Sequence, residues 1–391
     1  MPAMIDTWNN VDREVLRAAT SQLALLTFGG RCRMSNLDPH VTRLACGIHG
    51  IAPFFGTQVR SGTVSFGDEL DAWFVGQSEH NRRRLTLMRD ELYVTLDAFK
   101  RAGIEIIPLK GSAMILDDLD TIAWRPMADL DVLVSDPDKR QVDLAFAHAG
   151  YCLHGQSWKH RQYGPCDAGD RPLFTDSEHP GNPRNIESHP AVAEMFRGFR
   201  WDITPWIMNN LHQVDGVSIP TDRAMSLHLA VHLSVSILEA TTRMIHILDF
   251  ARVVDQAGGV SGIRQAVEKS GIEQHARFIY PAVALAAQWT AHSHLQAYEK
   301  ELRPHVSPAL PPWLARVDFH DISWAGREDR GVLDRVGLWA RSPAERLRML
   351  SSTILPSPAL LASAGYSGSG PLAAISWYPK HYRHLMRRIL G

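Results

Sequence analysis

Apolar residues recur every three or four positions along much of the first hundred residues, which is the period of an amphipathic helix. The clearest stripe falls in residues 78–100 and consists of Leu85, Met88, Leu92, Leu96 and Phe99. Ser78 is a residue type that begins helices, and Gly103 is the type that ends them. A second helix is expected over residues 11–26. The pattern therefore predicts a helical N-terminal region over residues 1–102.

The pattern changes at residue 104, where short apolar runs replace the helical period. Residues 104–109 and 129–135 favour strands because they are apolar, rich in β-branched side chains and without a helical period. A brief helix is expected between them, through Leu116. Another is expected over residues 137–149, begun by Asp136 and ended by Gly150. This strand–helix–strand–helix order indicates a small α/β unit.

Glycine and proline are dense over residues 155–183 and exclude long elements there. We expect short strands over residues 158–163 and 173–175 among loops, and a further strand over 184–189. The helical period returns after Pro220, and the helices expected there span residues 224–238, 243–254, 262–270 and 274–292. The C-terminal part is expected to hold a loop at 356–371 and a basic helix at 377–390.

Charge and cysteine content narrow the class of protein. The 391 residues include 41 Lys and Arg against 42 Asp and Glu, a net charge of −1, which argues against a nucleic-acid binder that relies on overall positive charge. The four cysteines lack the spacing of a disulfide scaffold or a zinc site and fit a reducing compartment. We read no signal peptide and no apolar stretch long enough to span a membrane, and we expect a cytoplasmic protein.

Two aspartates stand two positions apart on the strand expected at 129–135. Side chains alternate across a strand, so Asp129 and Asp131 should share one face while Leu130 and Val132 face a core. Neighbouring carboxylates repel each other unless a cation lies between them, and Mg²⁺ bound to substrate phosphates is the usual cation. The pair alone is weak evidence, because short acidic pairs are usually solvated or cap helices.

The flanking residues strengthen this interpretation. Lys110, Gly111 and Ser112 follow the first expected strand, where a glycine lets backbone N–H groups approach a phosphate. Glu187 lies on the third expected strand. Three carboxylates on neighbouring strands suit a two-metal phosphoryl-transfer site.

Taken together, these motifs resemble the uncharacterised nucleotidyltransferase family of the DNA polymerase β-like superfamily. The matching segments are LKGS at 109–112, RPMADLDVLV at 125–134, GY at 150–151, E-x-H at 187–189, LHLAVH at 227–232 and ILDFA at 247–251. The resemblance covers roughly residues 80–290.

The resemblance implies an α+β fold, with a small mixed-sheet core and large helical parts on both sides. The regions expected are a helical one at 1–102, the α/β core at 103–192, a helical acceptor or cleft domain at 193–345, and a loop with a basic tail helix at 346–391. It also implies that Asp129, Asp131 and Glu187 are catalytic and bind two Mg²⁺ ions, with Mn²⁺ as an alternative. Lys110, Gly111, Ser112 and Arg125 would contact the phosphates of an NTP.

Several assignments have competing interpretations. The insertion before Glu187 leaves Asp170, Asp176 and Glu178 as alternatives for the third carboxylate. Arg125 faces either the triphosphate or an acidic partner such as Asp117 or Asp118. His189 has either a structural or a catalytic role. The i,i+4 pair His228 and His232 is interpreted as packed or substrate-lining in preference to zinc-binding, because it lacks the glutamate of the metalloprotease motif. Asp249 is expected in a salt bridge with Arg243 or Arg252.

The sequence thus predicts a Mg²⁺-dependent nucleotidyltransferase that moves an NMP group to a small-molecule, peptide or protein acceptor and releases pyrophosphate. The competing hypotheses are a non-catalytic nucleotide-binding module on the same fold and an enzyme that adds nucleotides to nucleic acid, which the near-zero net charge disfavours.

Overall fold

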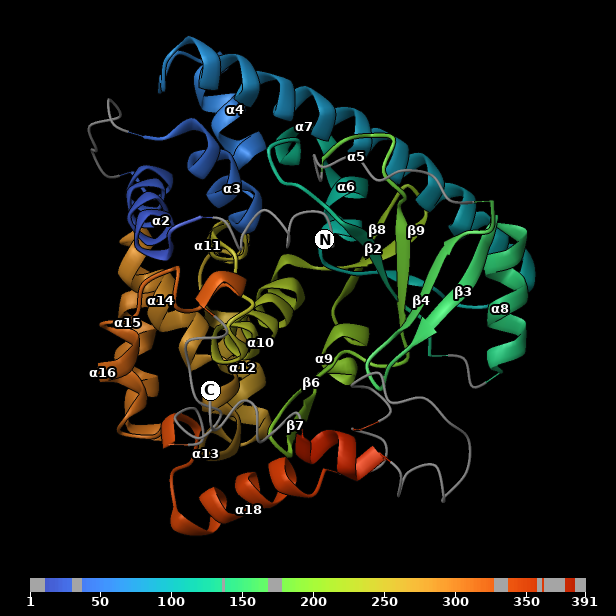
Figure 1. Ribbon diagram of the computed structural model, residues 1–391. Coiled ribbons are helices and arrows are strands. Elements are labelled where there is room, and N and C mark those ends of the chain that lie inside the picture. The colour runs from blue at the N-terminus through green and yellow to red at the C-terminus, as the bar shows by residue number, and fades with distance from the viewer. Residues whose placement is uncertain are drawn as a thin grey trace.

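The computed structural model describes residues 11–29, 37–135, 138–167, 178–326, 337–356, 361 and 377–383. Over these residues the chain adopts the expected α+β fold, in which a small mixed sheet lies between helices from both ends of the sequence (Figure 1). The expected strand at 173–175 and most of the expected loop at 356–371 lie outside the described residues, as do the residues beyond 383 of the expected tail helix.

The N-terminal part is helical, as expected. Its helices are α2 (Arg13–Thr27), α3 (Pro39–His49), α4 (Ala52–Arg60) and α5 (Asp68–Ala102). Gly103 ends α5 in the left-handed conformation, with φ 69°. The start predicted at Ser78 is wrong, because α5 begins ten residues earlier. Acidic residues fill its first turn, where they complement the helix dipole, and Ser78 instead lies buried within the helix.

The chain forms one five-stranded mixed sheet. Its strands are β1 (Ile107–Pro108), β2 (Asp129–Leu133), β3 (Tyr151–Gln156), β4 (Arg161–Pro165) and β5 (Asn185–His189), in the order β1-β2-β5-β4-β3. β2 and β5 are parallel, and their register places Asp131 opposite Glu187. The helices around the sheet are α6 (Lys110–Asp117), α7 (Leu119–Ile122) and α8 (Lys139–His148).

Strand β3 was not predicted from the sequence. Its residues show no apolar alternation, and Leu153 is exposed because the strand lies at the edge of the sheet. The antiparallel pairing of β3 with β4 brings Cys152 and Cys166 together in a disulfide, with 4.9 Å between their Cα atoms. The expectation that the cysteines are reduced is therefore wrong for this pair. Cys152 and Cys166 come together through the β3–β4 hairpin, and the spacing of the cysteines in the sequence does not indicate this hairpin.

Two hairpins begin the region that was expected to be helical from residue 193. They pair β6 (Ala193–Phe196) with β7 (Phe199–Asp202), and β8 (Leu211–Val214) with β9 (Val217–Pro220), with the short helix α9 (Thr204–Met208) between them. Each turn places two successive residues at positive φ, Arg197 with Gly198 and Asp215 with Gly216. Such two-residue turns favour hairpins, and the Asp-Gly pair in particular is a signal that the helical expectation missed.

Helices account for most of the described chain beyond residue 220. They include α10 (Asp222–Glu239), α11 (Met244–Gln256), α12 (Ser261–Ser270), α13 (Ile272–His275), η1 (Ala276–Phe278), α14 (Tyr280–Thr290), α15 (Ser293–Leu302), η2 (Arg303–His305), α16 (Leu310–Leu314), η3 (Trp324–Gly326) and α18 (Pro343–Ile354). Residues 377–383, the described part of the expected tail helix, are helical as well. Helix α10 is buried along most of its length, and α11, α12 and α14 pack around it. The helix expected over 274–292 is divided, because Pro281 starts α14 afresh.

A single hydrophobic core joins these parts. It runs from Leu16 in α2, through Leu130 and Ile186 in the sheet, to Met349 in α18. Within the described residues, the apolar helices fall short of the length and hydropathy that crossing a membrane requires.

Candidate active site

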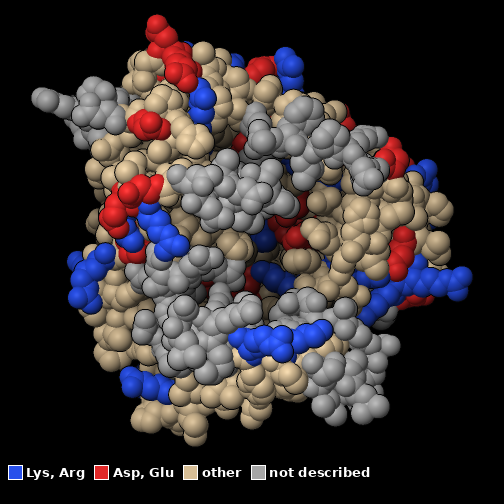
Figure 2. Space-filling view, in the orientation of Figure 1, with Lys and Arg blue, Asp and Glu red and all other residues tan. Residues whose placement is uncertain are grey.

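A cavity of about 240 Å³ lies between the sheet and the C-terminal helices. Figure 2 shows acidic and basic side chains close together in a hollow near the centre of this face. The cavity is lined by Lys110, Gly111, Arg125, Pro126, Met127, Ala128, Asp129, Asp131, Glu187, Leu229, His232, Leu233, Arg243, Ile245, His246 and Asp249. It therefore gathers residues from β2, β5, the start of α6, the loop before β2, and helices α10 and α11.

The three expected carboxylates all face this cavity. Asp129 and Asp131 project from the same face of β2, while Leu130 and Val132 are fully buried on the other face. Glu187 joins them because β5 runs parallel to β2 with Glu187 opposite Asp131. Of the alternatives for the third carboxylate, Glu178 is buried outside the cavity lining, and Asp170 and Asp176 lie outside the described residues.

Burial and mutual repulsion separate the pKa values of these carboxyls. Burial and the neighbouring Asp131 raise the pKa of Asp129 to about 6. Burial and both aspartates raise the pKa of Glu187 to about 8. Burial also favours neutral Asp131, but Lys110 and His189 outweigh it and hold the pKa of Asp131 well below its usual range. The ionised forms of Asp129 and Glu187 are therefore disfavoured by their surroundings.

Lys110 supplies the nearest positive charge. Its backbone turns through the left-handed region, with φ 45°, and its Nζ donates to Asp131 Oδ1 at 3.1 Å. Burial disfavours its charged form, but Asp131, Glu194 and Asp129 outweigh this and raise the pKa of Lys110. Lys110 is therefore held as a cation on the cavity wall.

Gly111 and Ser112 follow Lys110 at the start of α6, but only Gly111 lines the cavity. Gly111 lines the cavity, and a Cβ there would lie 2.6 Å from Arg125 Nη1 and 2.9 Å from Met127 Sδ. Ser112 is fully buried and does not line the cavity, and its Oγ has no hydrogen-bond partner among the described residues. The expected contact of the Ser112 hydroxyl with a phosphate is therefore not supported by the position of its side chain.

Arg125 and Asp249 form a buried ion pair that joins the loop before β2 to α11. Arg125 Nε donates to Asp249 Oδ2 at 2.7 Å, and the Asp249 side chain is 2% exposed. The salt bridge expected of Asp249 exists, but its partner is Arg125 instead of Arg243 or Arg252. Arg125 likewise pairs with neither Asp117 nor Asp118. This pairing was hidden from the sequence because the two residues are 124 positions apart.

Arg243 is a further cation on the cavity wall. Its guanidinium also donates to the backbone carbonyls of Gly47 and Ile48 at the end of α3. It is partly buried, and desolvation lowers its pKa. The cavity therefore carries three basic side chains, Lys110, Arg125 and Arg243, and four carboxylates, one of which, Asp249, is paired with Arg125.

Helix α5 fixes the loop that leads into β2. Arg84, 2% exposed, donates to the carbonyls of Met127, Ala128, Asn182 and Pro183. It thereby ties the approaches to β2 and β5 to one another. Asn81 donates to the carbonyls of Ala123 and Arg125. The sequence holds a signal for this role, because Arg84 is a charged residue next to the apolar stripe of a predicted helix. The motifs considered above did not include it.

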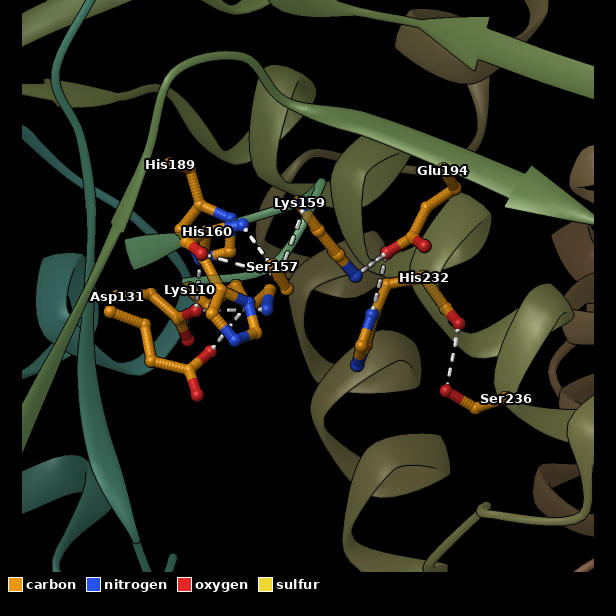
Figure 3. A network of polar contacts seen from close by, with 10 residues as sticks. Lys110, Asp131, Ser157, Lys159, His160, His189, Glu194, His232 and Ser236 are labelled. Atoms are coloured by element: carbon orange, nitrogen blue, oxygen red, sulfur yellow. Dashed lines mark hydrogen bonds and ion pairs between the residues drawn. The ribbon is translucent and has the colours of Figure 1, made fainter. Parts of the chain in front are cut away.

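A polar network extends from the carboxylates toward α10 (Figure 3). His189 Nε2 lies 2.8 Å from Asp131 Oδ1, and His160 Nδ1 lies 3.2 Å from Glu187 Oε2. Lys159 contacts Glu194, and His232 Nδ1 lies 2.9 Å from the same carboxylate. The sequence analysis did not single out His160, Lys159 or Glu194, because no motif marks the hairpin turn that carries the first two or the strand that carries Glu194.

The two histidines of α10 do not form a zinc pair in this arrangement. His232 lines the cavity and contacts Glu194, whereas His228 is buried and lines a separate small pocket with His189. Burial lowers the pKa of both histidines, to about 4 for His232. Their packed and substrate-lining interpretation therefore fits the structure.

The residues present fit a bound divalent cation. The oxygen donors of Asp129, Asp131 and Glu187 are the type that Mg²⁺ prefers, and a cation would relieve the repulsion that raises the pKa of Asp129 and Glu187. Lys110 contacts Asp131, so an ion shared by the three carboxylates would displace this ammonium group. Within the described part of the chain, the one close group of three metal-ligand side chains is His160, Glu187 and His189, whose ligand atoms lie within 4.8 Å of one another.

Comparison with known proteins agrees with this geometry. Neither the curated proteins nor the solved structures contain a significant match to the chain. A family profile described as uncharacterised nucleotidyltransferase matches residues 41–291, which include most of α3, all of α4 to α14 and every residue that lines the cavity. The chain therefore belongs to the uncharacterised nucleotidyltransferase family.

Proposed function

We propose that this protein is a Mg²⁺-dependent nucleotidyltransferase that moves an NMP group from an NTP to a small-molecule, peptide or protein acceptor and releases pyrophosphate. One observation carries the proposal. A single cavity holds three carboxylates from two paired strands and three basic side chains, in a chain of the nucleotidyltransferase family. Phosphoryl transfer needs this combination, since it depends on positioning and on neutralising charge.

The cations and carboxylates have separate tasks in the proposed reaction. Lys110, Arg125 and Arg243 bind the triphosphate, and Arg125 is held in place by Asp249. Asp129, Asp131 and Glu187 hold Mg²⁺, two ions in the fullest form of the proposal and Mn²⁺ as a substitute. When bound, the metal neutralises charge that develops on the phosphate oxygens.

Glu187 handles the acceptor proton. The acceptor oxygen forms a bond to the α-phosphorus, and the bond from that phosphorus to the bridging oxygen breaks, so pyrophosphate leaves with the electron pair. Glu187 takes the proton from the acceptor. Beside a bound cation the Glu187 carboxyl would be ionised and able to accept this proton, because the cation offsets the repulsion from the two aspartates that raises its pKa.

The apolar side of the cavity is the proposed place for the nucleoside or the acceptor. It is formed by Leu229 and Leu233 of α10 and Ile245 of α11. Such a wall binds a flat or apolar group without requiring further charge. We propose ATP as the first donor to test, and a nucleic-acid acceptor is not favoured because the net charge is −1.

A cytoplasmic location is also part of the proposal, and the cysteines test it. Disulfides persist mainly in oxidising compartments, so the Cys152–Cys166 pair argues for an oxidised environment or a protected bond. Trapping free thiols in intact cells, followed by mass measurement of the purified chain, distinguishes the cases. Alkylated Cys152 and Cys166 agree with a reducing compartment, and an intact disulfide argues against one.

The experiment that tests the function is a survey of labelled donors. The full chain is incubated with each α-labelled NTP, Mg²⁺ or Mn²⁺, and a cell extract as the source of acceptors. Label should move to an extract component in a metal-dependent manner, and Asp131→Asn should abolish the transfer. Transfer at the wild-type rate by folded Asp131→Asn would contradict the proposal.

A further inference from the structure

The hairpin turn between β3 and β4 carries a histidine into the candidate active site. Ser157 N donates to His160 O at 2.8 Å, and Ser157 Oγ accepts the backbone N–H of His160 at 3.1 Å. These bonds close the turn and fix the backbone of His160, whose side chain lies in the network of Figure 3.

His160 meets two other ligand-type side chains at that position. Glu187 and His189 come from β5, and the ligand atoms of the three residues lie within 4.8 Å of one another. Ligand atoms bonded to one ion at roughly 2.0–2.2 Å lie at most about 4.4 Å apart, so small side-chain rotations would bring these three onto one ion. Glu187 and His189 share strand β5, and His160 ends the turn that leads into β4, so the backbone would not need to move far.

The donor atoms are arranged as those of a metal site often are. His160 Nδ1 is shielded from solvent and makes no hydrogen bond among the described residues, although Glu187 Oε2 lies 3.2 Å away. Buried polar atoms without a partner are uncommon and point to an absent ligand. His189 contacts the Asp131 carboxylate, and such carboxylates orient histidines that bind metals.

From this geometry we propose that His160, Glu187 and His189 bind a divalent transition-metal ion. Two imidazoles and one carboxylate favour Zn²⁺ or Co²⁺, whereas Mg²⁺ prefers oxygen donors alone. The site lies beside the Asp129–Asp131 pair and shares Glu187 with it, so Glu187 bridges two positions of different metal preference. The inference does not depend on the transfer reaction, because it concerns an ion bound without nucleotide.

Metal binding by the full chain, free of nucleotide, tests the proposal. Equilibrium dialysis against Zn²⁺, Co²⁺ and Mg²⁺ should give one Zn²⁺ or Co²⁺ per chain and a visible absorption band for the Co²⁺ form. His160→Ala should weaken Zn²⁺ binding by about tenfold or more. His189→Gln should also weaken Zn²⁺ binding by about tenfold or more. If one of the two variants fails to fold, the other still tests the site. Circular dichroism verifies that each variant is folded.

Two controls separate the possible results. Exposed His148 lies on α8, outside the group, so His148→Ala should bind Zn²⁺ as the wild type does. Exposed His154 lies on β3, also outside the group, so His154→Ala should keep Zn²⁺ binding as well. Absence of stoichiometric binding, or equal affinity in His160→Ala, would overturn the metal site and leave the transferase proposal standing. Zinc binding by a chain that transfers no nucleotide would support the metal site and contradict the transferase proposal.

Discussion

At the scale of single residues, the shape of the cavity depends on position 111 being a glycine. Gly111 permits Arg125 and Met127 to pack against the start of α6, since a Cβ would lie within 3 Å of both. The unusual backbone conformation belongs to the preceding residue, Lys110, with φ 45°. The need for glycine at position 111 thus comes from close packing and not from a left-handed φ at that position.

We predict that Gly111→Ala weakens NTP binding more than it harms the fold. The added methyl group displaces Arg125 from the cavity wall, and overpacking of this kind costs about 1–3 kcal/mol. Calorimetric titration of a Mg²⁺–NTP analogue into the folded variant measures the effect. Gly76→Ala is the control, because open space surrounds that helical position. Unchanged affinity in Gly111→Ala would refute the role of this loop in binding phosphate.

The raised pKa of Glu187 makes stability depend on pH when metal is absent. The folded protein holds a proton on Glu187 up to about pH 8, whereas the unfolded chain releases it near 4.5. Stability contributed by this group is therefore lost as pH rises through that window. The buried histidines have lowered pKa values, so their contribution to stability increases as pH rises toward about 6.5. A comparison with a variant at position 187 is therefore needed to isolate the effect of Glu187.

Glu187→Gln should accordingly become more stable relative to the wild type as pH rises from 5 to 8 in EDTA. One pKa unit corresponds to about 1.4 kcal/mol, so the relative gain is at most a few kcal/mol. Thermal or urea unfolding of both proteins at several pH values measures it. Mg²⁺ should reduce the difference by stabilising the ionised wild type. A difference in stability that does not change with pH would show that folding does not raise the pKa of the Glu187 carboxyl.

At the scale of elements, sequence patterns predicted what is local. The alternation at Asp129–Leu133 placed both aspartates on one face, and the apolar stripe before Gly103 marked α5. The patterns missed β3, whose exposed edge leaves no alternation, and the two hairpins β6–β7 and β8–β9. Pairings across the chain, such as Arg125 with Asp249 and His160 with Glu187, arise from packing between distant segments and leave no local signal.

The ion pair between Arg125 and Asp249 joins two such segments. We predict that Asp249→Asn destabilises the protein by about 3–5 kcal/mol, because it leaves a buried guanidinium without its counter-charge. The folded fraction should also bind NTP more weakly, since Arg125 loses its orientation. Unfolding and calorimetric titration measure the two effects.

Asp255→Asn provides a matched control on the same helix. Asp255 pairs with His292 at the surface, with 67% of its side chain exposed, so its loss should change stability by less than about 1 kcal/mol. Equal effects of the two substitutions would mean that the Arg125–Asp249 pair has no special role.

At the scale of the whole molecule, the cavity lies where the sheet meets the C-terminal helices. One side supplies the carboxylates, Lys110 and Arg125, and α10 and α11 supply the apolar wall (Figure 1). The continuous core holds these two sides together. An NTP bound there would contact both, which is how the fold would couple recognition of the donor to the position of the acceptor.

The position of the transferred label tests the central claim most directly. The protein, Mg²⁺ and the acceptor-containing extract are incubated in parallel with α-labelled and γ-labelled forms of the preferred NTP. Nucleotidyl transfer moves the α-label to the acceptor and releases the γ-label in pyrophosphate, and Asp131→Asn should do neither. A γ-label that appears on the acceptor, or α-label transfer that survives in folded Asp131→Asn, would contradict the account.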